Sequence, residues 1–283
     1  MFLWGPLTKP HNKHFGPPVY FSLSIMLYYL QSFPLIQAPF LSQYDWLVHG
    51  FGLKDITIED YLKALKLPQV VIPKTHQPHG NKVHLLRSDA KVHGPGPKGD
   101  PSGSTVHSPL LEGDAFVTDQ ASVVCWVRTA DCLPILIVDI KKKVVGAVHA
   151  GWRGTAAKII LETLKTFQNH FKSSVADLRV ALGPAICGRC YQVGMDVAHA
   201  FEKAGLFPAP WIEESSRGRW HLDIAYANLH LLEEAGLRRE QIYTSLACTA
   251  CDLEKFRSFR KEGGKKGEQV NFVLIRPETK NED

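Results

Sequence analysis

Two side chains that could bind a metal ion stand at the ends of neighbouring apolar runs. Cys132 lies between RTAD and LPILIVDI, and His149 lies near the end of the run VVGAVHA. Thiolate and imidazole groups are preferred zinc ligands, and a catalytic zinc takes three protein ligands and keeps a fourth position for water or substrate. The pattern therefore predicts a catalytic metal site that has one further protein ligand.

The third ligand is expected among the histidines that precede Cys132. The candidates are His76, His79, His84 and His107. His79 is preferred because it stands directly before a glycine, at the turn into a strand. His84 follows five residues later inside that strand, and spacing alone leaves the choice between the two open.

Each of these residues also has an ordinary structural explanation. A buried cysteine usually behaves as a small hydrophobic residue, and a histidine at a strand end is usually a hydrogen-bonded core residue. Asp131, directly before Cys132, favours the metal site, because a carboxylate among apolar strands is costly to bury without a partner. It would serve as a general acid or base, or orient a ligand imidazole.

The segment GWRGTAAK follows His149 directly and has features of an anion site. Gly151 and Gly154 allow the backbone to turn tightly and to approach a ligand closely. A helix that starts here would direct free N–H groups toward the turn, and Arg153 would add a fork of donors suited to phosphate. The alternative is a glycine-rich turn between strand and helix that carries a surface arginine.

The remaining cysteines include two C-x-x-C pairs, CGRC at 187–190 and CTAC at 248–251. They are compatible with a four-thiolate zinc site, with disulfides or with free thiols. Because 57 residues separate Cys190 from Cys248, far more than in compact zinc ribbons, the two pairs need not meet.

Strands and helices alternate along the part of the chain that carries these residues. Thr57 is a candidate N-cap of a helix that ends before Pro68, and further helices are predicted at 155–171, 194–205 and 223–235. The predicted strands lie at 44–53, at two places within 69–86, and at 114–118, 121–129, 133–140, 144–150, 177–186, 241–249 and 270–276. Several neighbouring strands are joined by turns too short for a crossover, so the sheet should be mixed.

The composition is that of a globular protein. The chain has 283 residues, of which 45% are hydrophobic and 22% charged, and a net charge of +5. Its mild basic excess suits a small anionic substrate. Because no Lys/Arg block with interleaved aromatic residues occurs, nucleic acid is not expected as a partner. Residues 92–104 and the KEGGKKGE segment at 261–268 read as loops.

Residues 1–40 are expected to form an extension outside the fold, and residues 41–278 a single domain. The apolar run VYFSLSIMLYYL has 12 residues, whereas a membrane span needs about 20. A signal peptide is the alternative, but no clean A-x-A cleavage site follows the run. No stable membrane partner is therefore expected.

Five segments together resemble one known family. They are QPHGNKV, RTADCLP, VVGAVHAGWRGT, LGPAICGRCYQVG and CTACDLEKFRSFRKEGG. The family was labelled multicopper polyphenol oxidase, or laccase-domain proteins, and is now described as zinc-dependent purine nucleoside phosphorylases. The resemblance implies a single-domain α/β (α+β) layered sandwich with a mixed β-sheet flanked by helices. It also implies that His79, Cys132 and His149 bind Zn2+, with copper as the alternative.

The resemblance further implies an activity and a set of substrate contacts. Members phosphorolyse adenosine, inosine, guanosine or methylthioadenosine to the free base and ribose 1-phosphate, and deaminate adenosine. On that basis Asp131 and Arg153 are expected to be catalytic, and Gly151, Arg153, Phe259 and Arg260 to bind substrate. The expected partners are a purine nucleoside and phosphate, and the chain is expected to be a monomer or homodimer in the cytoplasm, where Cys132 stays reduced.

Two other functions are carried forward. A copper-dependent polyphenol oxidase would need many histidines, typically in H-x-H pairs, and the 13 histidines of this chain form no such pair. A peptidoglycan-precursor editing factor, a role attributed to bacterial relatives, would need the same residues and is separated only by substrate assays. The chain also lacks part of the usual segment before Q-x-H-G, and it has Cys187 where relatives commonly have glycine.

Overall fold

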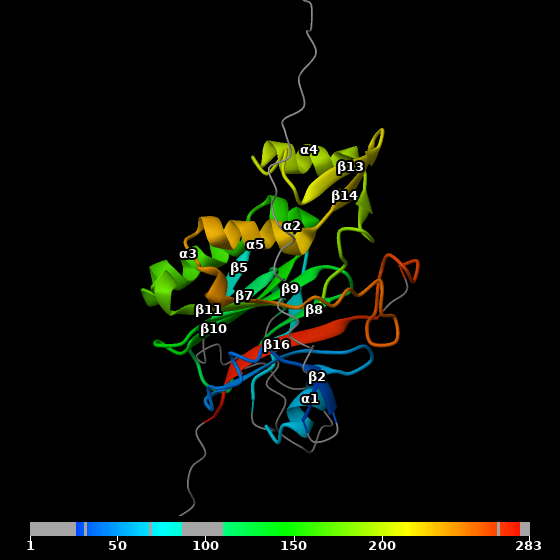
Figure 1. The fold of residues 1–283 in the computed structure, drawn as a ribbon. Helices are drawn as coiled ribbons and strands as arrows, with labels where there is room; N and C mark the ends of the chain where they lie inside the picture. The colour runs from blue at the N-terminus through cyan, green and yellow to red at the C-terminus, as the bar shows by residue number, and fades with distance from the viewer. Residues whose placement is uncertain (1–26, 31–32, 68–69, 87–109, 265–266, 278–283) are drawn as a thin grey trace, which may run out of the picture.

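Two β-sheets stack face to face, and helices cover their outer faces (Figure 1). The computed structural model describes residues 27–30, 33–67, 70–86, 110–264 and 267–277. This α/β layered sandwich, with a mixed sheet flanked by helices, confirms the expected fold class. The predicted loop at 92–104 and most of the apolar run at 19–30 lie outside the described residues.

The larger sheet has six strands in the order β15-β11-β9-β10-β7-β5. Its members are β5 (Val83–Leu85), β7 (Ala115–Thr118), β9 (Leu133–Asp139), β10 (Val144–Ala150), β11 (Leu178–Leu182) and β15 (Ile242–Thr244). The β11–β15 and β5–β7 pairs are parallel, and the others are antiparallel. The short turn between β9 and β10 imposes one of the antiparallel pairs, and together with the two parallel pairs it makes the sheet mixed.

The second sheet has five strands in the order β1-β2-β3-β16-β8, all antiparallel. They are β1 (Leu27–Leu30), β2 (Phe33–Ile36), β3 (Leu47–Phe51), β8 (Cys125–Thr129) and β16 (Gln269–Ile275). Smaller pairings join β4 (Thr75–His76) to β6 (Leu111–Glu112), and β12 (Gln192–Val193) to β14 (Arg219–Leu222) and β13 (Ile212–Ser216).

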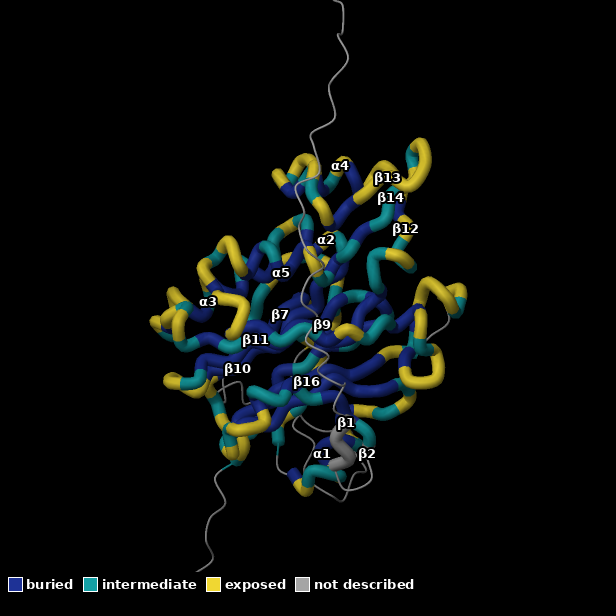
Figure 2. Tube along the Cα trace, viewed as in Figure 1, coloured by how far each residue is buried: buried dark blue, intermediate teal, exposed yellow. Residues whose placement is uncertain are grey.

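Alternate side chains of the central strands pack into different layers. Leu133, Ile135 and Ile137 of β9 face the helices, while Leu136 and Val138 face the second sheet. Strands covered on both faces read as continuous apolar runs, as the sequence indicated. Figure 2 shows the buried residues concentrated along these strands and the exposed ones in the outer loops.

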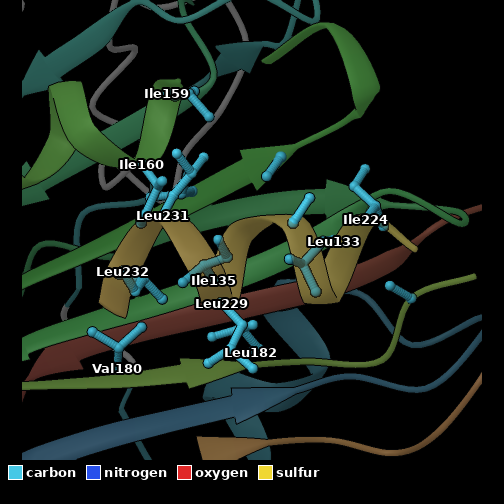
Figure 3. Packing of buried hydrophobic residues seen from close by; sticks show 14 of the residues in the cluster. Leu133, Ile135, Ile159, Ile160, Val180, Leu182, Ile224, Leu229, Leu231 and Leu232 are labelled. Atoms are coloured by element: carbon cyan, nitrogen blue, oxygen red, sulfur yellow. The ribbon is translucent and has the colours of Figure 1, made fainter. Parts of the chain in front are cut away.

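Helices close the outer faces of the sandwich. α3 (Ile159–Phe171) and α5 (Ile224–Glu234) cover the six-stranded sheet, where leucine and isoleucine side chains of α5 meet those of β9 and β11 (Figure 3). α1 (Ile58–Ala64) covers the five-stranded sheet and begins at the predicted N-cap Thr57, which forms a capping box with Asp60. Two short 3-10 turns, Val175–Asp177 and Arg239–Gln241, flank β11 and β15.

The helix predicted from residue 155 is divided in two. α2 (Trp152–Ala156) begins earlier, inside the GWRG segment, and α3 follows after Lys158, whose φ of 57° is left-handed. A single left-handed residue breaks the i to i+4 hydrogen-bond ladder, so apolar periodicity across it does not mean one continuous helix. α4 (Met195–Lys203) packs against β12 and β14. The helix was predicted from the sequence, but the small sheet that it contacts was not.

The fold begins before the boundary expected at residue 41. β1 and β2 form an edge of the five-stranded sheet, and Leu35, Ile36 and Ala38 are fully buried in its core. The backbone carbonyl of Pro34 accepts a hydrogen bond from the Tyr61 hydroxyl. Proline is tolerated near strand starts and in connections, so Pro34 and Pro39 are compatible with a segment inside the fold. In the described part of the chain no helix has the length and apolar character needed to cross a bilayer.

Candidate metal centre

Three separate elements bring His79, Cys132 and His149 together. His79 lies in the loop between β4 and β5, Cys132 precedes β9 directly, and His149 is near the end of β10. β9 and β10 pair so that His149 lies opposite Pro134, which sets Cys132 beside the end of β10. The Sγ atom and the two ring nitrogens all lie within 4.8 Å of one another. These residues therefore form a group that could hold a metal ion.

The other histidines considered for this site lie elsewhere. His84 Nε2 lies 2.8 Å from the carbonyl oxygen of Glu112, and its ring stacks on Phe116 with centroids 5.9 Å apart. His76 is exposed on β4 and is not in the group. His107 lies outside the described residues.

The turn that carries Cys132 crosses from one sheet to the other. β8 ends at Thr129 in the five-stranded sheet, and β9 begins at Leu133 in the six-stranded sheet. Within this turn Asp131 has a φ of 87°, and His79 in the facing loop has a φ of 64°. Left-handed backbone in residues other than glycine costs roughly 1–3 kcal/mol and is concentrated at functional sites. Because Cys132 lies in the turn that joins the two sheets, the metal group lies at the seam, the place where the two layers meet.

Asp114 is the carboxylate that orients this group. It is fully buried, and its Oδ1 lies 2.7 Å from Nδ1 of His149. Its two oxygens also accept hydrogen bonds from the backbone N–H groups of His79 and Gly80, at 3.1 and 2.6 Å. One carboxylate therefore fixes the ring of one ligand and the backbone of another, and leaves Nε2 of His149 for a metal.

Asp131, which the sequence offered for this orienting role, has different contacts. Its Oδ1 accepts a hydrogen bond from the Thr249 hydroxyl at 2.6 Å, and its Oδ2 accepts one from the backbone N–H of Arg260 at 2.7 Å. The expectation that Asp131 orients a ligand imidazole is therefore wrong. It instead joins the turn before β9 to two loops that come from the far end of the chain.

The electrostatics of the group favour an ionised thiol. Burial alone would raise the pKa of Cys132, but the charges and hydrogen bonds of His149 and His79 outweigh burial and lower that pKa to about 6. Burial likewise opposes a charge on His149, yet Cys132 and Asp114 together raise its pKa to about 9. Without a metal, the pair is thus a thiolate beside an imidazolium at neutral pH.

Gly151 and Gly154 permit close contacts within the protein. A Cβ atom at Gly151 would lie 3.1 Å from Sγ of Cys132 and 3.3 Å from Cδ2 of His79. One at Gly154 would lie 2.9 Å from the carbonyl oxygen of Gly80. Both glycines therefore let α2 pack directly on the metal group. Because α2 has only five residues, its contribution as a helix dipole toward an anion is smaller than the sequence suggested.

Two arginines near this group, Arg153 and Arg260, lie over aromatic rings. The guanidinium of Arg153 stacks on Trp152 at 4.2 Å, and that of Arg260 lies 5.2 Å from the ring centroid of Tyr191. Arg260 also donates a hydrogen bond to the carbonyl oxygen of Gln192 at 2.6 Å. Phe259, the residue before Arg260, is 63% exposed.

Tyr191 connects these arginines electrostatically to the metal group. Burial raises the pKa of its phenol, Cys132 and Asp131 raise it further, and Arg260 and Arg153 act in the opposite direction. All four charged groups are therefore near this phenol, which stays protonated at neutral pH. Tyr191 is thus a member of the site that sequence reasoning missed.

Asp114 was missed as well, although a signal for it was present. It stands directly before the apolar residues Ala115–Thr118 of β7, as Asp131 stands close to those of β9. The argument that a carboxylate beside a buried strand needs a partner applies equally to both. For Tyr191 the signal was only its place inside the LGPAICGRCYQVG segment.

The donor set fits a divalent metal. One thiolate and two imidazoles are preferred by zinc, whose bonds of about 2.0–2.3 Å place tetrahedral ligand atoms roughly 3.3–3.8 Å apart. The three ligand atoms all lie within 4.8 Å of one another, which is compatible with that range. His149 is buried and Cys132 half-buried, whereas His79 is exposed, so a fourth ligand would enter from the side of His79.

The protein also has a cavity that the metal group does not line. A cavity of about 890 Å³ is lined by Ala185, Pro210, Tyr226 and Leu246, among others, and by none of the three residues of the metal group. The candidate site is therefore identified by the chemistry of its side chains and not by the size of a cavity.

The chain is similar to known proteins of one family. Residues 57–276 match the family model described as multi-copper polyphenol oxidoreductase laccase. A purine nucleoside phosphorylase of Deinococcus radiodurans is 42% identical over 157 residues, which is 55% of this chain and 58% of that protein. One of Bacteroides thetaiotaomicron is 31% identical over 210 residues, which is 73% of each.

The fold is also found in solved structures. The crystal structure of YlmD from Geobacillus stearothermophilus superposes with a TM-score of 0.74 at 26% identity, covering 86% of this chain and 96% of that one. The matched segment spans only 58% of the Deinococcus protein, whereas the structural match covers nearly all of YlmD. The chain therefore belongs to the family described as multi-copper polyphenol oxidoreductase laccase, to which it was assigned by its sequence motifs.

Proposed function

We propose that this chain is a zinc-dependent purine nucleoside phosphorylase. It would convert adenosine, inosine, guanosine or methylthioadenosine, together with phosphate, to the free base and ribose 1-phosphate. The observation that carries the proposal is the convergence of His79, Cys132 and His149 beside Tyr191 and two arginines. The names of the relatives in Deinococcus and Bacteroides support the same reaction class.

Zinc is proposed as the metal in preference to copper. Cysteine with two histidines also occurs in blue-copper sites, but those add a weak axial ligand, usually methionine. Among the described residues the methionine is Met195, whose sulfur accepts a hydrogen bond from the Trp220 indole at 3.2 Å. An open fourth position on a site with nitrogen and sulfur ligands is the arrangement of catalytic zinc. Bound there, zinc would act as a Lewis acid that polarises an oxygen of substrate or water.

The side chains around this position have separate proposed roles. Arg153 is assigned to phosphate, because its guanidinium is exposed on α2 next to the metal group and offers a bidentate fork. Arg260 and Phe259 are assigned to the nucleoside, with the exposed Phe259 ring as a surface for stacking the base. Gly151 lets the backbone of α2 lie close to Cys132, and we assign it to the wall of the substrate site on that basis.

Tyr191 and Asp131 complete the proposed site. The Tyr191 phenol keeps its proton at neutral pH and is available as a hydrogen-bond donor to the substrate. Both carboxylate oxygens of Asp131 already accept hydrogen bonds, one of them from the backbone of Arg260. We therefore assign Asp131 to the positioning of Arg260 and Phe259 and not to proton transfer.

Adenosine deamination is proposed as a second reaction of the same site. It uses water in place of phosphate, so it should be independent of phosphate concentration. A thiolate ligand must remain reduced, which supports a cytoplasmic location. All six cysteines are free thiols in the structure, consistent with such a compartment.

The test is a product analysis of the purified, zinc-loaded protein. Adenosine is supplied with and without phosphate, and adenine, inosine and hypoxanthine are followed by chromatography. Adenine should form only with phosphate, and inosine with or without it. Cys132→Ala should lose both products, whereas Cys125→Ala, which changes a buried cysteine outside the metal group, should keep them. Full phosphorolysis by zinc-free Cys132→Ala would overturn the proposal, and stoichiometric copper with oxygen consumption would replace it with an oxidase.

The role of Arg153 is tested separately. Arg153→Gln should raise the KM for phosphate about tenfold or more, because a bidentate charged contact is lost. Its rate of adenosine deamination should stay near that of the unaltered protein. Arg179→Gln is the matched control, since Arg179 lies on β11 and hydrogen-bonds only to local backbone carbonyls of Ala176 and Leu178. Equal phosphate KM values in the two variants would remove Arg153 from the phosphate site.

A further inference from the structure

The two C-x-x-C pairs meet in space, although the long interval between them had suggested that they need not. The four Sγ atoms of Cys187, Cys190, Cys248 and Cys251 all lie within 4.8 Å of one another. The sulfurs of Cys190 and Cys251 lie 3.5 Å apart. This group is separate from the one formed by His79, Cys132 and His149.

Parallel strand pairing explains the convergence. β11 and β15 run side by side in the same direction, with Leu182 opposite Thr244. The chains that leave them stay paired, because Ala185 forms a bridge with Cys248 and its carbonyl accepts the N–H of Thr249 at 3.2 Å. The two cysteine pairs meet despite their long separation in the sequence, because both follow neighbouring parallel strands at the same edge of the sheet.

The two pairs adopt matching turns. In the first, the N–H groups of Cys190 and Tyr191 both donate to the carbonyl of Cys187, at 2.9 and 3.0 Å. In the second, the N–H groups of Cys251 and Asp252 both donate to the carbonyl of Cys248, at 3.2 Å each. Each turn brings its two cysteine side chains to the same side of the backbone.

One sulfur also accepts a backbone hydrogen bond from the opposite turn. The N–H of Cys187 donates to Sγ of Cys248 at 3.2 Å. Gly188, in the first turn, packs on the N-cap of α5, because a Cβ there would lie 3.1 Å from Cβ of Asp223. The position of the turn is thus fixed by the fold.

The sulfur geometry matches a shared metal ion better than disulfides. A disulfide requires a sulfur–sulfur distance of about 2.05 Å. Four thiolates on a tetrahedral zinc, with bonds of about 2.3 Å, lie roughly 3.8 Å apart. The observed 3.5 Å between Cys190 and Cys251 is close to the second value. All six cysteines are free.

We propose that Cys187, Cys190, Cys248 and Cys251 bind one zinc ion in a closed, structural site of four thiolates. Because all four positions are filled by protein, this ion has no place for substrate. Its effect is to tie the loop after β11 to the loop after β15. Tyr191 follows Cys190 directly, and Thr249, between Cys248 and Cys251, donates to Asp131. The ion therefore stabilises two loops that reach the candidate metal centre.

Metal stoichiometry of the full-length protein tests the site. Protein purified under nitrogen with a non-thiol reductant should contain two zinc ions per chain by mass spectrometry of the metal. Cys132→Ala and Cys251→Ser should each contain one, and the double variant none. Cys125→Ala should keep two. Equal zinc content in Cys251→Ser and in the unaltered protein would overturn the proposal. Because the two sites are counted separately, inactivity toward nucleosides leaves this result readable.

A second measurement does not depend on any variant folding. Cobalt(II) replaces zinc in the unaltered protein, and the thiolate-to-metal charge-transfer absorption is titrated to its end point. Two cobalt ions should bind, one of them with the more intense absorption of four thiolate ligands. After chelation and denaturation without reductant, all six cysteines should react with an alkylating reagent. Alkylation of only two cysteines would show two disulfides in place of a metal site.

Discussion

Asp114 illustrates how a single residue can define a site without touching substrate. It is fully buried, and it contacts Nδ1 of His149 and the backbone of His79 and Gly80. The two ligands lie at equal sequence distances from it, 35 residues on either side. A carboxylate in this position holds the ligand ring in one orientation and makes it a stronger base.

Replacement of Asp114 by asparagine should weaken metal binding by about 10- to 100-fold. The amide keeps the size of the side chain but loses the charge that stabilises the His149 ring. Zinc affinity is measured by competition with a chromophoric chelator. Asp139→Asn is the matched control, since Asp139 is equally buried but accepts hydrogen bonds from Lys141 and Lys142 at a distant turn. Unchanged affinity in Asp114→Asn would contradict the role assigned here.

Gly151 leads to a second prediction at this scale. In Gly151→Ala the backbone is not strained, because its φ of −73° and ψ of 173° suit any residue. The new Cβ would instead lie 3.1 Å from Sγ of Cys132, so the ligand must shift by a few tenths of an ångström. We expect metal affinity to fall, because the displaced sulfur belongs to a ligand, and thermal unfolding of the metal-free protein shows whether the variant still folds. Gly80→Ala, whose Cβ would have only an ordinary contact at 3.7 Å, should bind metal normally.

Much of the site could be predicted from the sequence, on two different grounds. Cys132 and His149 stood out because each interrupts or ends an apolar strand. The choice of His79 over His84 came from the resemblance to a family, because both residues precede or enter the same strand. Only the folded chain shows that His84 turns to Glu112 and Phe116. Tyr191 could not be identified, because its neighbours Arg153, Arg260 and Asp131 are brought together by long-range contacts.

At the scale of elements, the strands were easier to predict than the breaks between helices. Apolar runs such as 133–139 and 144–150 have the length and β-branched content of buried strands. Lys158 adopts a left-handed conformation that its side chain does not signal. The break there depends on the packing of α2 against the loop of His79, for example through Asn81, which donates to the carbonyl of Ala157 at 3.1 Å.

A buried histidine in β3 makes the stability of this element depend on pH. His49 is 1% exposed, and its Nε2 accepts a hydrogen bond from the N–H of Ala38 at 3.1 Å. Burial lowers its pKa to about 4, below the value of about 6.5 in an unfolded chain. Between these values the unfolded state binds more protons than the folded state. Stability is therefore full above pH 6.5 and decreases as the pH falls toward 4.

From these two pKa values, His49 should reduce the free energy of unfolding by about 2 kcal/mol between pH 8 and pH 5. His49→Gln keeps a hydrogen-bond acceptor near the N–H of Ala38 but has no side chain that titrates in this range. Between pH 8 and pH 5 its free energy of unfolding should therefore fall by about 2 kcal/mol less than that of the unaltered protein. Urea denaturation at both pH values measures the difference. His170→Gln, which changes an exposed histidine of α3, should keep the full pH dependence. An identical pH dependence in His49→Gln would mean that His49 titrates normally.

At the scale of the whole molecule, the division into two sheets explains where the site lies. The chain passes from the five-stranded to the six-stranded sheet through the turn at 130–132. Side chains in that turn lie at the seam, where the loop of His79 and the start of α2 also meet. The mixed sheet could be predicted from short turns. Its division into two layers could not, because β16 pairs with β3 and β8, which are distant in the sequence.

The N-terminal strands complete the five-stranded sheet, and this makes a prediction about the extent of the fold. Leu35 is fully buried among Val48, Leu62, Phe272 and Leu274, and its side chain fills the space over Gly50. Leu35→Ala should lower the free energy of unfolding by about 2–5 kcal/mol, because it leaves a cavity in a packed core. Leu110→Ala, at a residue that is 66% exposed, should change it by no more than about 0.5 kcal/mol. If residues before 41 were an extension outside the fold, the two variants would unfold at the same urea concentration. A large difference between them would place the N-terminal boundary of the cooperative unit before Leu35.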